Sequence, residues 1–316
     1  MIRQHSLIRP NSGFTLVELM VALVLGLIIV AAAIQLFVTA QIGANLQRAV
    51  ADVQDNGNFG INYMIEDIRK ANFSADKPII KSGIPFAGIV LGAGNLPALN
   101  PPVTATEMTK KEAEGTGKQT NTSSDQLTIQ YFVDRTDQYD CEAKLIPQNS
   151  YVLQRYFILN GDLRCVAGTY PKAAPTATDA DGKPLPRTLT GFTGNGEIVI
   201  RNAEYMRILF AVSDDKVDGD NISNDPIPAD GLVQKNFRYI DSYPTTQPLP
   251  RIRGVQIGLL MRSNESVGGN AEVKTRNSSS FNVLDKNNIT VNTVDSNLRQ
   301  VISQTVAFRN ALGGGS

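Results

Sequence analysis

One acidic residue stands inside a long apolar run near the N-terminus. Glu18 follows Phe14-Thr-Leu-Val and precedes sixteen residues, Leu19 to Ile34, that carry no charged or polar side chain. A carboxylate within the hydrocarbon of a bilayer is costly, so it normally marks a partner or a function. Glu18 is therefore the first residue for which the sequence demands a chemical explanation.

A cut between Gly13 and Phe14 would supply that explanation. It creates an amine on Phe14, four residues before Glu18. An amine and a carboxylate about 4 Å apart attract by roughly 4 kcal/mol at an effective dielectric constant near 20. The amine can come from the same chain or from a neighbouring subunit. In the second case Glu18 sets the register in which two helices pack.

Three interpretations of the N-terminus compete. The arginines before the apolar run favour a cytoplasmic N-terminus, and continued to Ala40 the run is about long enough to span a membrane. It can be a permanent anchor, or a secretory signal cut after Ala31-Ala32-Ala33. It can also follow a leader, residues 1–13, that is cut on the cytoplasmic side so that the apolar helix is kept. Glu18 favours the leader, because neither an anchor nor a secretory signal needs a carboxylate.

Other residue types exclude several kinds of chemistry. The only histidine is His5, so a chain without residues 1–13 has none, which excludes Ser-His-Asp and Cys-His catalysis and histidine-ligated zinc. Lys plus Arg equals Asp plus Glu at 30 each, so we expect no direct binding to nucleic acid. Neither a dinucleotide-binding loop nor a Walker motif is present. The sequence predicts no enzyme and no cofactor.

The two cysteines cannot make a four-ligand metal site. In a chain with an export signal, Cys141 and Cys165 predict one disulfide, and two unrelated buried thiols are the alternative. A weak calcium candidate is the acidic segment with Asp214, Asp218 and Asp220. The bidentate glutamate of an EF-hand is absent there, so a solvated acidic turn is the better interpretation.

A long helix must position Glu18. No proline occurs between Pro10 and Pro78, and apolar residues from Ile42 to Ile68 recur with a period near 3.6. We therefore expect one helix of nearly 60 residues, apolar all round over 14–40 and amphipathic over 41–73. Gly57 and Gly60 weaken it by roughly 1 kcal/mol each. Asn72 can take the left-handed conformation that ends it.

Alternating apolar residues predict strands after Phe73. Asn160-Gly161 predicts a hairpin turn within them. We expect long loops at roughly 92–125, 171–195 and 214–250, and exclude Gly313 to Ser316 as a linker. The expected strands are 127–133, 151–159, 163–166, 197–201, 205–212, 254–261 and 305–309.

Several motifs resemble a known superfamily. Gly13-Phe14-Thr-Leu-Val-Glu18-Leu19 resembles the leader of type IV pilins and type II secretion pseudopilins. The resemblance implies that prepilin peptidase cuts after Gly13, that Phe14 becomes N-methylated and that Glu18 guides assembly. Three further stretches, 53–73, 253–262 and 305–310, resemble minor pilins of the PilW family. Ala71-Asn72 stands where that family commonly has Ala-Gly.

The resemblance implies a pilin-like α+β fold, in which the long N-terminal helix packs on an antiparallel β-sheet head, residues 74–312. It also implies an inner-membrane protein with a cytoplasmic N-terminus and a periplasmic head, which then enters the fibre at its tip. Expected partners are other minor pilins, the major pilin, a PilY-family tip adhesin and prepilin peptidase. The expected role is to initiate assembly and support twitching motility, adhesion or DNA uptake. Alternatives are a GspJ-like minor pseudopilin and a secreted periplasmic binding module.

Overall fold

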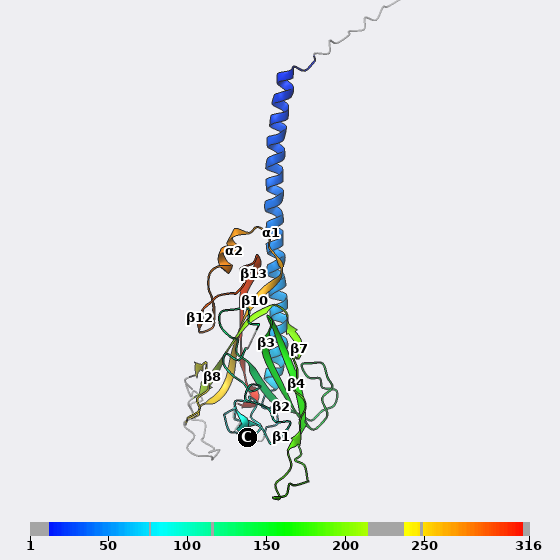
Figure 1. The fold of residues 1–316 in the computed structure, drawn as a ribbon, viewed down its shortest axis with the longest axis vertical. Helices are drawn as coiled ribbons and strands as arrows, with labels where there is room; N and C mark the ends of the chain where they lie inside the picture. The colour runs from blue at the N-terminus through cyan, green and yellow to red at the C-terminus, as the bar shows by residue number, and fades with distance from the viewer. Residues whose placement is uncertain (1–12, 76, 115–116, 214–236, 247–248, 312–316) are drawn as a thin grey trace, which may run out of the picture.

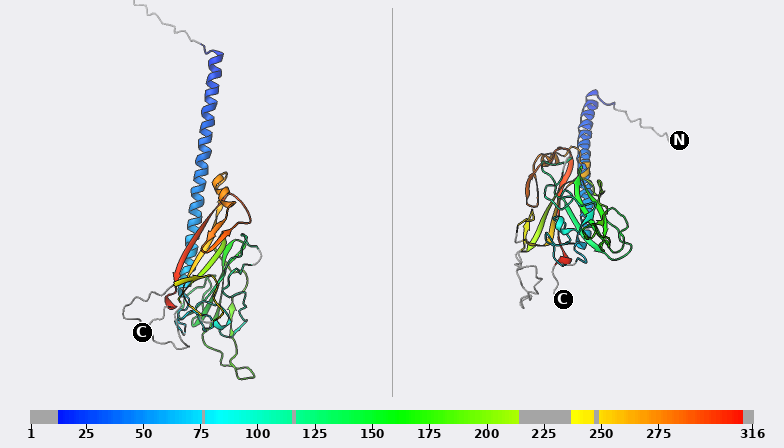
Figure 2. Two further views of the ribbon diagram at one scale, coloured as in Figure 1. Left: turned by 90° about the vertical axis from the view of Figure 1, so that its left-hand side faces the viewer. Right: turned by 60° about the horizontal axis from the view of Figure 1, so that its bottom comes forward.

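A single helix of 55 residues, α1 (Leu16–Lys70), dominates the shape of the molecule in this computed structural model. The structure describes residues 13–75, 77–114, 117–213, 237–246 and 249–311. The N-terminal half of α1 projects freely, and its C-terminal half runs along one flank of a β-rich head (Figures 1 and 2). The fold is therefore α+β, as the sequence predicts.

One antiparallel sheet, sheet A, lies directly against α1. Its strand order is β13-β10-β8-β9, and α1 contacts β13 and β10. The longest strand, β10, pairs with both β8 and β13 along most of its length. The bounds are β8 (Ala203–Ser213), β9 (Phe237–Ile240), β10 (Arg251–Ser266) and β13 (Asn297–Ala307).

A second antiparallel sheet, sheet B, faces α1 and sheet A across the main core. Its order is β2-β3-β4-β6, with β7 also paired to β4. The turn between β3 and β4 is Asn160-Gly161. Both residues have positive φ (54° and 80°), as a two-residue type I′ hairpin turn requires. The bounds are β2 (Leu127–Val133), β3 (Ser150–Leu159), β4 (Asp162–Pro171), β6 (Thr190–Gly191) and β7 (Glu197–Ile200).

Short elements cover the rims of the two sheets. A parallel pair joins β1 to β5, a small hairpin joins β11 to β12, and the helix α2 packs beside α1 through Val273 and Ala49. Two 3-10 turns, η1 and η2, lie in the first long loop and at the C-terminal end. The bounds are η1 (Ala93–Asn95), β1 (Leu99–Asn100), β5 (Arg187–Thr188), α2 (Ala271–Asn277), β11 (Phe281–Val283), β12 (Lys286–Ile289) and η2 (Arg309–Ala311).

Side chains from α1 and both sheets form the main core. Alternate residues of β3, such as Val152 and Tyr156, point toward α1 with Ile61, Met64 and Ile65. The opposite face of sheet B buries a separate cluster that includes Leu153 and Tyr170 beneath the long 86–108 loop. Sheet B is thus covered on both faces, which explains why the strand β2 is buried along its whole length.

Most predicted strands are present, but two expectations about the C-terminal part were wrong. The last strand was expected at 305–309, whereas β13 spans Asn297–Ala307 and is followed by η2. Its partly exposed Arg-, Gln- and Ser-rich first half lacks the apolar alternation that marks a strand. The strand β9 lies inside the predicted loop 214–250. It is short, and its pairing with β8 is a tertiary contact that leaves little pattern in the sequence.

Candidate assembly site

Thr15 caps the first turn of α1. Its backbone is extended (φ −80°, ψ 150°), and its hydroxyl accepts a hydrogen bond from the backbone N–H of Glu18 at 3.2 Å. Such a cap satisfies one of the N–H groups that a helix start leaves unpaired, and the helix dipole favours a carboxylate in this turn. The side chains around Glu18 therefore sit on a helix with a defined beginning.

The apolar half of α1 makes no core with its own head. Phe14 is 82% exposed, and large hydrophobic side chains remain exposed from there to Val38. Among the described residues, α1 is the one helix long and apolar enough to cross a membrane. A continuous apolar surface of this length needs lipid or other apolar helices around it. The free half of α1 therefore fits a membrane-anchoring segment.

Two glycines let the sheets approach the C-terminal half of α1. A Cβ added at Gly57 would overlap the side chain of Ile302 on β13, and one at Gly60 would overlap Ile200 on β7. The sequence identified these glycines only as residues that weaken the helix. In the structure, side chains of sheet A contact the helix backbone at Gly57, and side chains of sheet B contact it at Gly60.

The end of α1 is fixed by two asparagines. Asn72 has positive φ (64°), as its predicted role at the helix end requires. Its side-chain oxygen accepts from Gly88 N–H at 2.8 Å, and its amide donates to the carbonyl of Asn310 at 2.8 Å. Asn310 in turn donates to the carbonyl of Ala71 at 3.2 Å. The loop after the helix and the C-terminal segment around Asn310 thus both contact the C-terminal end of α1.

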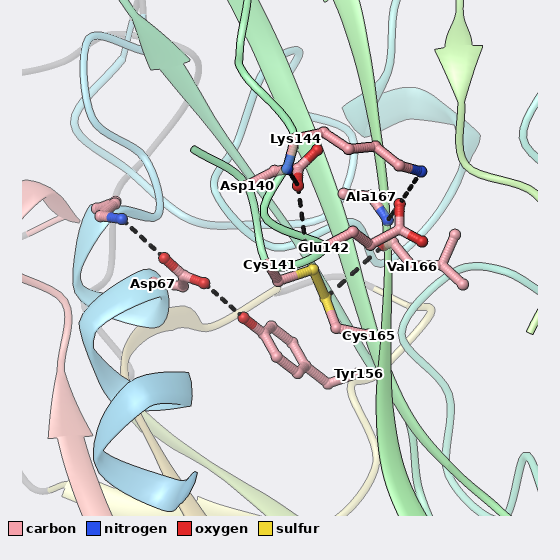
Figure 3. Close-up of a disulfide and its surroundings, with 10 residues drawn as sticks. Asp67, Asp140, Cys141, Glu142, Lys144, Tyr156, Cys165, Val166 and Ala167 are labelled. Atoms are coloured by element: carbon pink, nitrogen blue, oxygen red, sulfur yellow. Dashed lines mark hydrogen bonds and ion pairs between the residues drawn. A yellow bond between two sulfur atoms is a disulfide. The ribbon is translucent and has the colours of Figure 1, made fainter. Parts of the chain in front are cut away.

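A buried carboxylate joins α1 to sheet B (Figure 3). Asp67 accepts a hydrogen bond of 2.7 Å from the hydroxyl of Tyr156 on β3 and another of 2.7 Å from Lys70 Nζ. Burial raises the pKa of Tyr156 well above its usual value, and the Asp67 charge adds to that effect. Tyr156 therefore stays protonated and donates to Asp67 across the neutral range.

The disulfide predicted from the sequence lies beside this contact. Cys141 and Cys165 are bonded with a Cα–Cα distance of 6.1 Å, which ties the 134–149 loop to β4 (Figure 3). The loop is held further by Asp140, which accepts from two backbone N–H groups, and by Glu142, which accepts from Ala167 N–H at 3.2 Å. The loop is therefore anchored close to the end of α1.

An ionic cluster that the sequence did not predict links sheet A to β2. Arg207 on β8 is 1% exposed and pairs with Asp125, Asp241 and Asp285. Burial alone would lower the pKa of Arg207, but Asp285 and Asp125 raise it. Asp125 also accepts from Ile208 N–H at 2.8 Å, so it covers the edge of β8 and links sheet A to β2.

The remaining predicted site lies elsewhere. Asp214, Asp218 and Asp220, the weak calcium candidates, fall outside the described residues. Within the part of the chain that the structure describes, no group of three His, Cys, Asp or Glu side chains could hold a metal ion.

Comparisons with known families fit this architecture. Residues 177–310 match the model of type IV pilus-assembly protein W, PilW, and residues 8–34 match the prokaryotic N-terminal methylation motif. These two matches support a type IV pilus protein of the PilW kind. The methylation motif spans Gly13, Phe14 and Glu18, and the PilW match covers β8, β10 and β13.

One solved structure with a detectable likeness is a type IV-like pilin from Thermus thermophilus. It is 12% identical, and the alignment covers 81% of this chain and 97% of the other, with a TM-score of 0.37. No curated protein sequence matches this chain significantly.

The PilW assignment confirms the family that the sequence motifs predicted. The matched family is one of type IV pilus-assembly proteins rather than an enzyme class. A pilin acts by contact with other pilus components, and the methylation motif with its apolar helix fits a membrane-anchored pilin. The sequence correctly predicted the Cys141–Cys165 disulfide, and the methylation motif that it pointed to is matched over residues 8–34. Sequence reasoning missed Asp67, Asp125 and Arg207, whose partners are distant in the sequence.

Proposed function

We propose that this PilW-family protein is a minor pilin that helps to initiate type IV pilus assembly and belongs to the tip or priming complex. The observation that carries the proposal is the free half of α1, which is apolar, capped by Thr15 and marked by Glu18 near its start. Such an apolar helix is unstable when exposed to water. Its proposed function is to insert into the membrane and then to associate with helices of other subunits.

The proposed pathway begins with processing at the cytoplasmic face. Prepilin peptidase cuts between Gly13 and Phe14, and Phe14 is then N-methylated. The apolar segment 14–40 is about 40 Å long at 1.5 Å per residue, which spans the inner membrane with the head in the periplasm. Arginines in the leader favour this orientation.

Assembly follows from the charge that Glu18 carries near the start of α1. A subunit that joins the bundle presents its Phe14 amine to Glu18 of a neighbour, and this attraction sets the axial register of the two helices. The proposed partners are other minor pilins, the major pilin and a PilY-family adhesin at the tip. Twitching, adhesion or DNA uptake would then depend on the fibre that the complex starts.

The match to PilW supports a pilus rather than a type II secretion pseudopilin of the GspJ type. Deletion of the chain should therefore reduce surface pili while leaving type II secretion intact. Loss of secretion with normal pili would reverse the assignment.

The first test is the N-terminal residue and mass of the mature protein isolated from its native membrane. We expect a chain that starts at Phe14 and is one methyl group heavier than its sequence. A chain that starts near Ile34 would contradict the proposal, because Glu18 and the assembly helix would be gone. The protein would then be a secreted periplasmic module.

The second test removes the charge of Glu18 without changing its size. Glu18→Gln should still be cut and inserted but should support few pili, counted by electron microscopy of sheared cells. Glu66→Gln is the matched control, since Glu66 is an exposed glutamate on the same helix at the level of the head. Normal piliation by Glu18→Gln would contradict the proposed role of the carboxylate.

A further inference from the structure

Two buried arginines of the head, Arg207 and Arg299, are paired with carboxylates of the same chain. Arg207 meets three carboxylates, and Arg299 meets Glu204 at 2.7 Å and Asp295 at 2.6 Å. A guanidinium carries five N–H donors, and burying it without acceptors is costly. These two arginines are therefore saturated by groups within their own chain.

Arg155 on β3 departs from this pattern. Its guanidinium lies over the ring of Phe157 at 4.4 Å and near that of Phe192 at 6.0 Å. Within the described residues it donates no hydrogen bond and forms no ion pair, and its buried Nε has no acceptor. Burial lowers the pKa of Arg155, and the distant charge of Glu107 offsets only part of this effect. The cation is half-buried and uncompensated.

A second arginine shares the same face of sheet B. Arg164 on β4 lies directly across from Phe157, and Arg155 lies across from Val166, so the two arginines are diagonal neighbours. Diagonal Cα atoms in an antiparallel pair are about 7–8 Å apart. Arg164 makes one hydrogen bond, to the carbonyl of Gly196 at 3.1 Å, and its buried Nε also lacks an acceptor.

The aromatic platform beneath Arg155 is built into the sheet. Phe192 has positive φ (66°) and donates its N–H to the carbonyl of Ala167 at 2.7 Å. It sits so close to β4 that a Cβ at Gly168 would overlap it. Phe192 is thus fixed against β4, and the guanidinium of Arg155 stacks on the neighbouring ring of Phe157.

We propose that Arg155 and Arg164 form a docking site for a carboxylate on an acidic segment of a partner protein. Arginine forks match carboxylates in geometry and give the strongest hydrogen bonds between side chains. Nucleic acid fits poorly, because binding to its backbone needs a longer row of cations than these two arginines provide.

The site is independent of helix-driven assembly. Arg155 points away from α1, on the face of β3 that carries Leu153 and Phe157, whereas Tyr156 points toward α1. Contacts made through α1 therefore lie on the other side of sheet B from Arg155. Failure of the docking site would leave the proposed role of Glu18 untouched.

Binding is tested with full-length mature protein in detergent micelles and a tetraglutamate peptide with blocked ends. We expect saturable binding that weakens with added salt and falls about tenfold or more in Arg155→Met and in Arg164→Met. Lys183→Met, in an exposed loop, is the control and should bind normally. Equal binding of tetraglutamine, or tighter binding of inorganic phosphate, would overturn the carboxylate assignment.

A thermal melt separates docking from a structural role. Because Arg155 has no hydrogen-bond acceptor or carboxylate partner among the described residues, Arg155→Met should leave the melting temperature unchanged or raise it. Arg207→Met should lower it by several degrees, since three carboxylates lose their cation. If Arg155→Met lowers the melting temperature as much as Arg207→Met, Arg155 is structural and the proposal fails.

The natural partner is tested in cells with a photo-crosslinking amino acid in place of Phe157. We expect crosslinks to a segment of another protein that contains Asp or Glu. Reversing one charge pair, with Arg155→Glu in this chain and Arg at the crosslinked acid, should restore a contact that Arg155→Glu alone abolishes. Crosslinks confined to this chain, or no rescue, would overturn the site.

Discussion

The hydroxyl of Tyr156 donates a 2.7 Å hydrogen bond to the carboxylate of Asp67, and this buried contact joins sheet B to the last turn of α1. A hydrogen bond to a charged group contributes about 1.5–3 kcal/mol. Tyr156→Phe should therefore lower the free energy of unfolding by about that amount, measured by urea denaturation of the full chain in detergent. The rest of the ring stays in the core, so the loss reports the hydroxyl.

Tyr139→Phe is the matched control for this prediction. Tyr139 is 59% exposed on the 134–149 loop, and removing its hydroxyl should change the free energy of unfolding by less than about 0.5 kcal/mol. Equal losses in the two variants would mean that the Asp67 contact does not stabilise the junction.

Buried tyrosines predict that the head loses stability in alkaline solution. Burial, aided by nearby acidic or phenolic groups, raises the pKa of Tyr131, Tyr156 and Tyr170 well above the usual value near 10. The unfolded chain ionises these groups near pH 10 and the folded chain does not. The stability is therefore fully present below about pH 10 and is lost as the pH rises further.

The slope of this loss can be measured. Each such tyrosine should reduce the free energy of unfolding by about 1.4 kcal/mol per pH unit above pH 10. Denaturation at pH 10 and pH 11 should show a slope that is smaller by that amount in Tyr156→Phe. An identical slope in both proteins would contradict the inferred pKa.

Gly60 should resist replacement by alanine although it lies in a helix. Helix propensity alone predicts that alanine stabilises by about 1 kcal/mol. The added Cβ would overlap Ile200, so we expect Gly60→Ala to destabilise the head by about 1–3 kcal/mol in thermal or urea unfolding.

Two variants make this comparison specific. Gly43→Ala lies in the same helix with nothing within 4 Å of the new Cβ, and it should not destabilise the protein. Gly60→Ala combined with Ile200→Ala, which removes the overlapping Cγ1 and Cδ1, should lose less stability than the sum of the two single variants. A destabilised Gly43→Ala would show that alanine harms α1 for reasons other than the contact with β7.

The disulfide should contribute measurably to stability. Closing a loop with a sequence separation of 24 residues stabilises by about 3–4 kcal/mol in the chain-entropy estimate. A double variant, Cys141→Ser with Cys165→Ser, should therefore unfold at lower urea concentration than the oxidised protein. Dithiothreitol should shift the oxidised protein toward the variant and leave the variant unchanged. A shift of both would point to an effect unrelated to this bond.

Much of the fold could be predicted from local patterns in the sequence. The apolar run and the 3.6 period predicted α1, and the alternation in 127–133 and the Asn160-Gly161 turn predicted β2 and the β3–β4 hairpin. These features are local, because a helix or hairpin is specified by residues a few positions apart. The first half of β13 and the short β9 lack such a pattern, so their positions were wrong or missed.

The sequence alone determined the leader motif, the placement of Glu18 and a pair of cysteines suited to a disulfide, since each depends on residue type and short spacing. Only the tertiary structure decided which polar groups meet. Asp67 and Tyr156 are 89 residues apart, and Asp125 and Arg207 are 82 apart. It also decided which arginines are left without a carboxylate. Contacts between distant segments follow from how the sheets pack on α1, and no local period in the sequence encodes them.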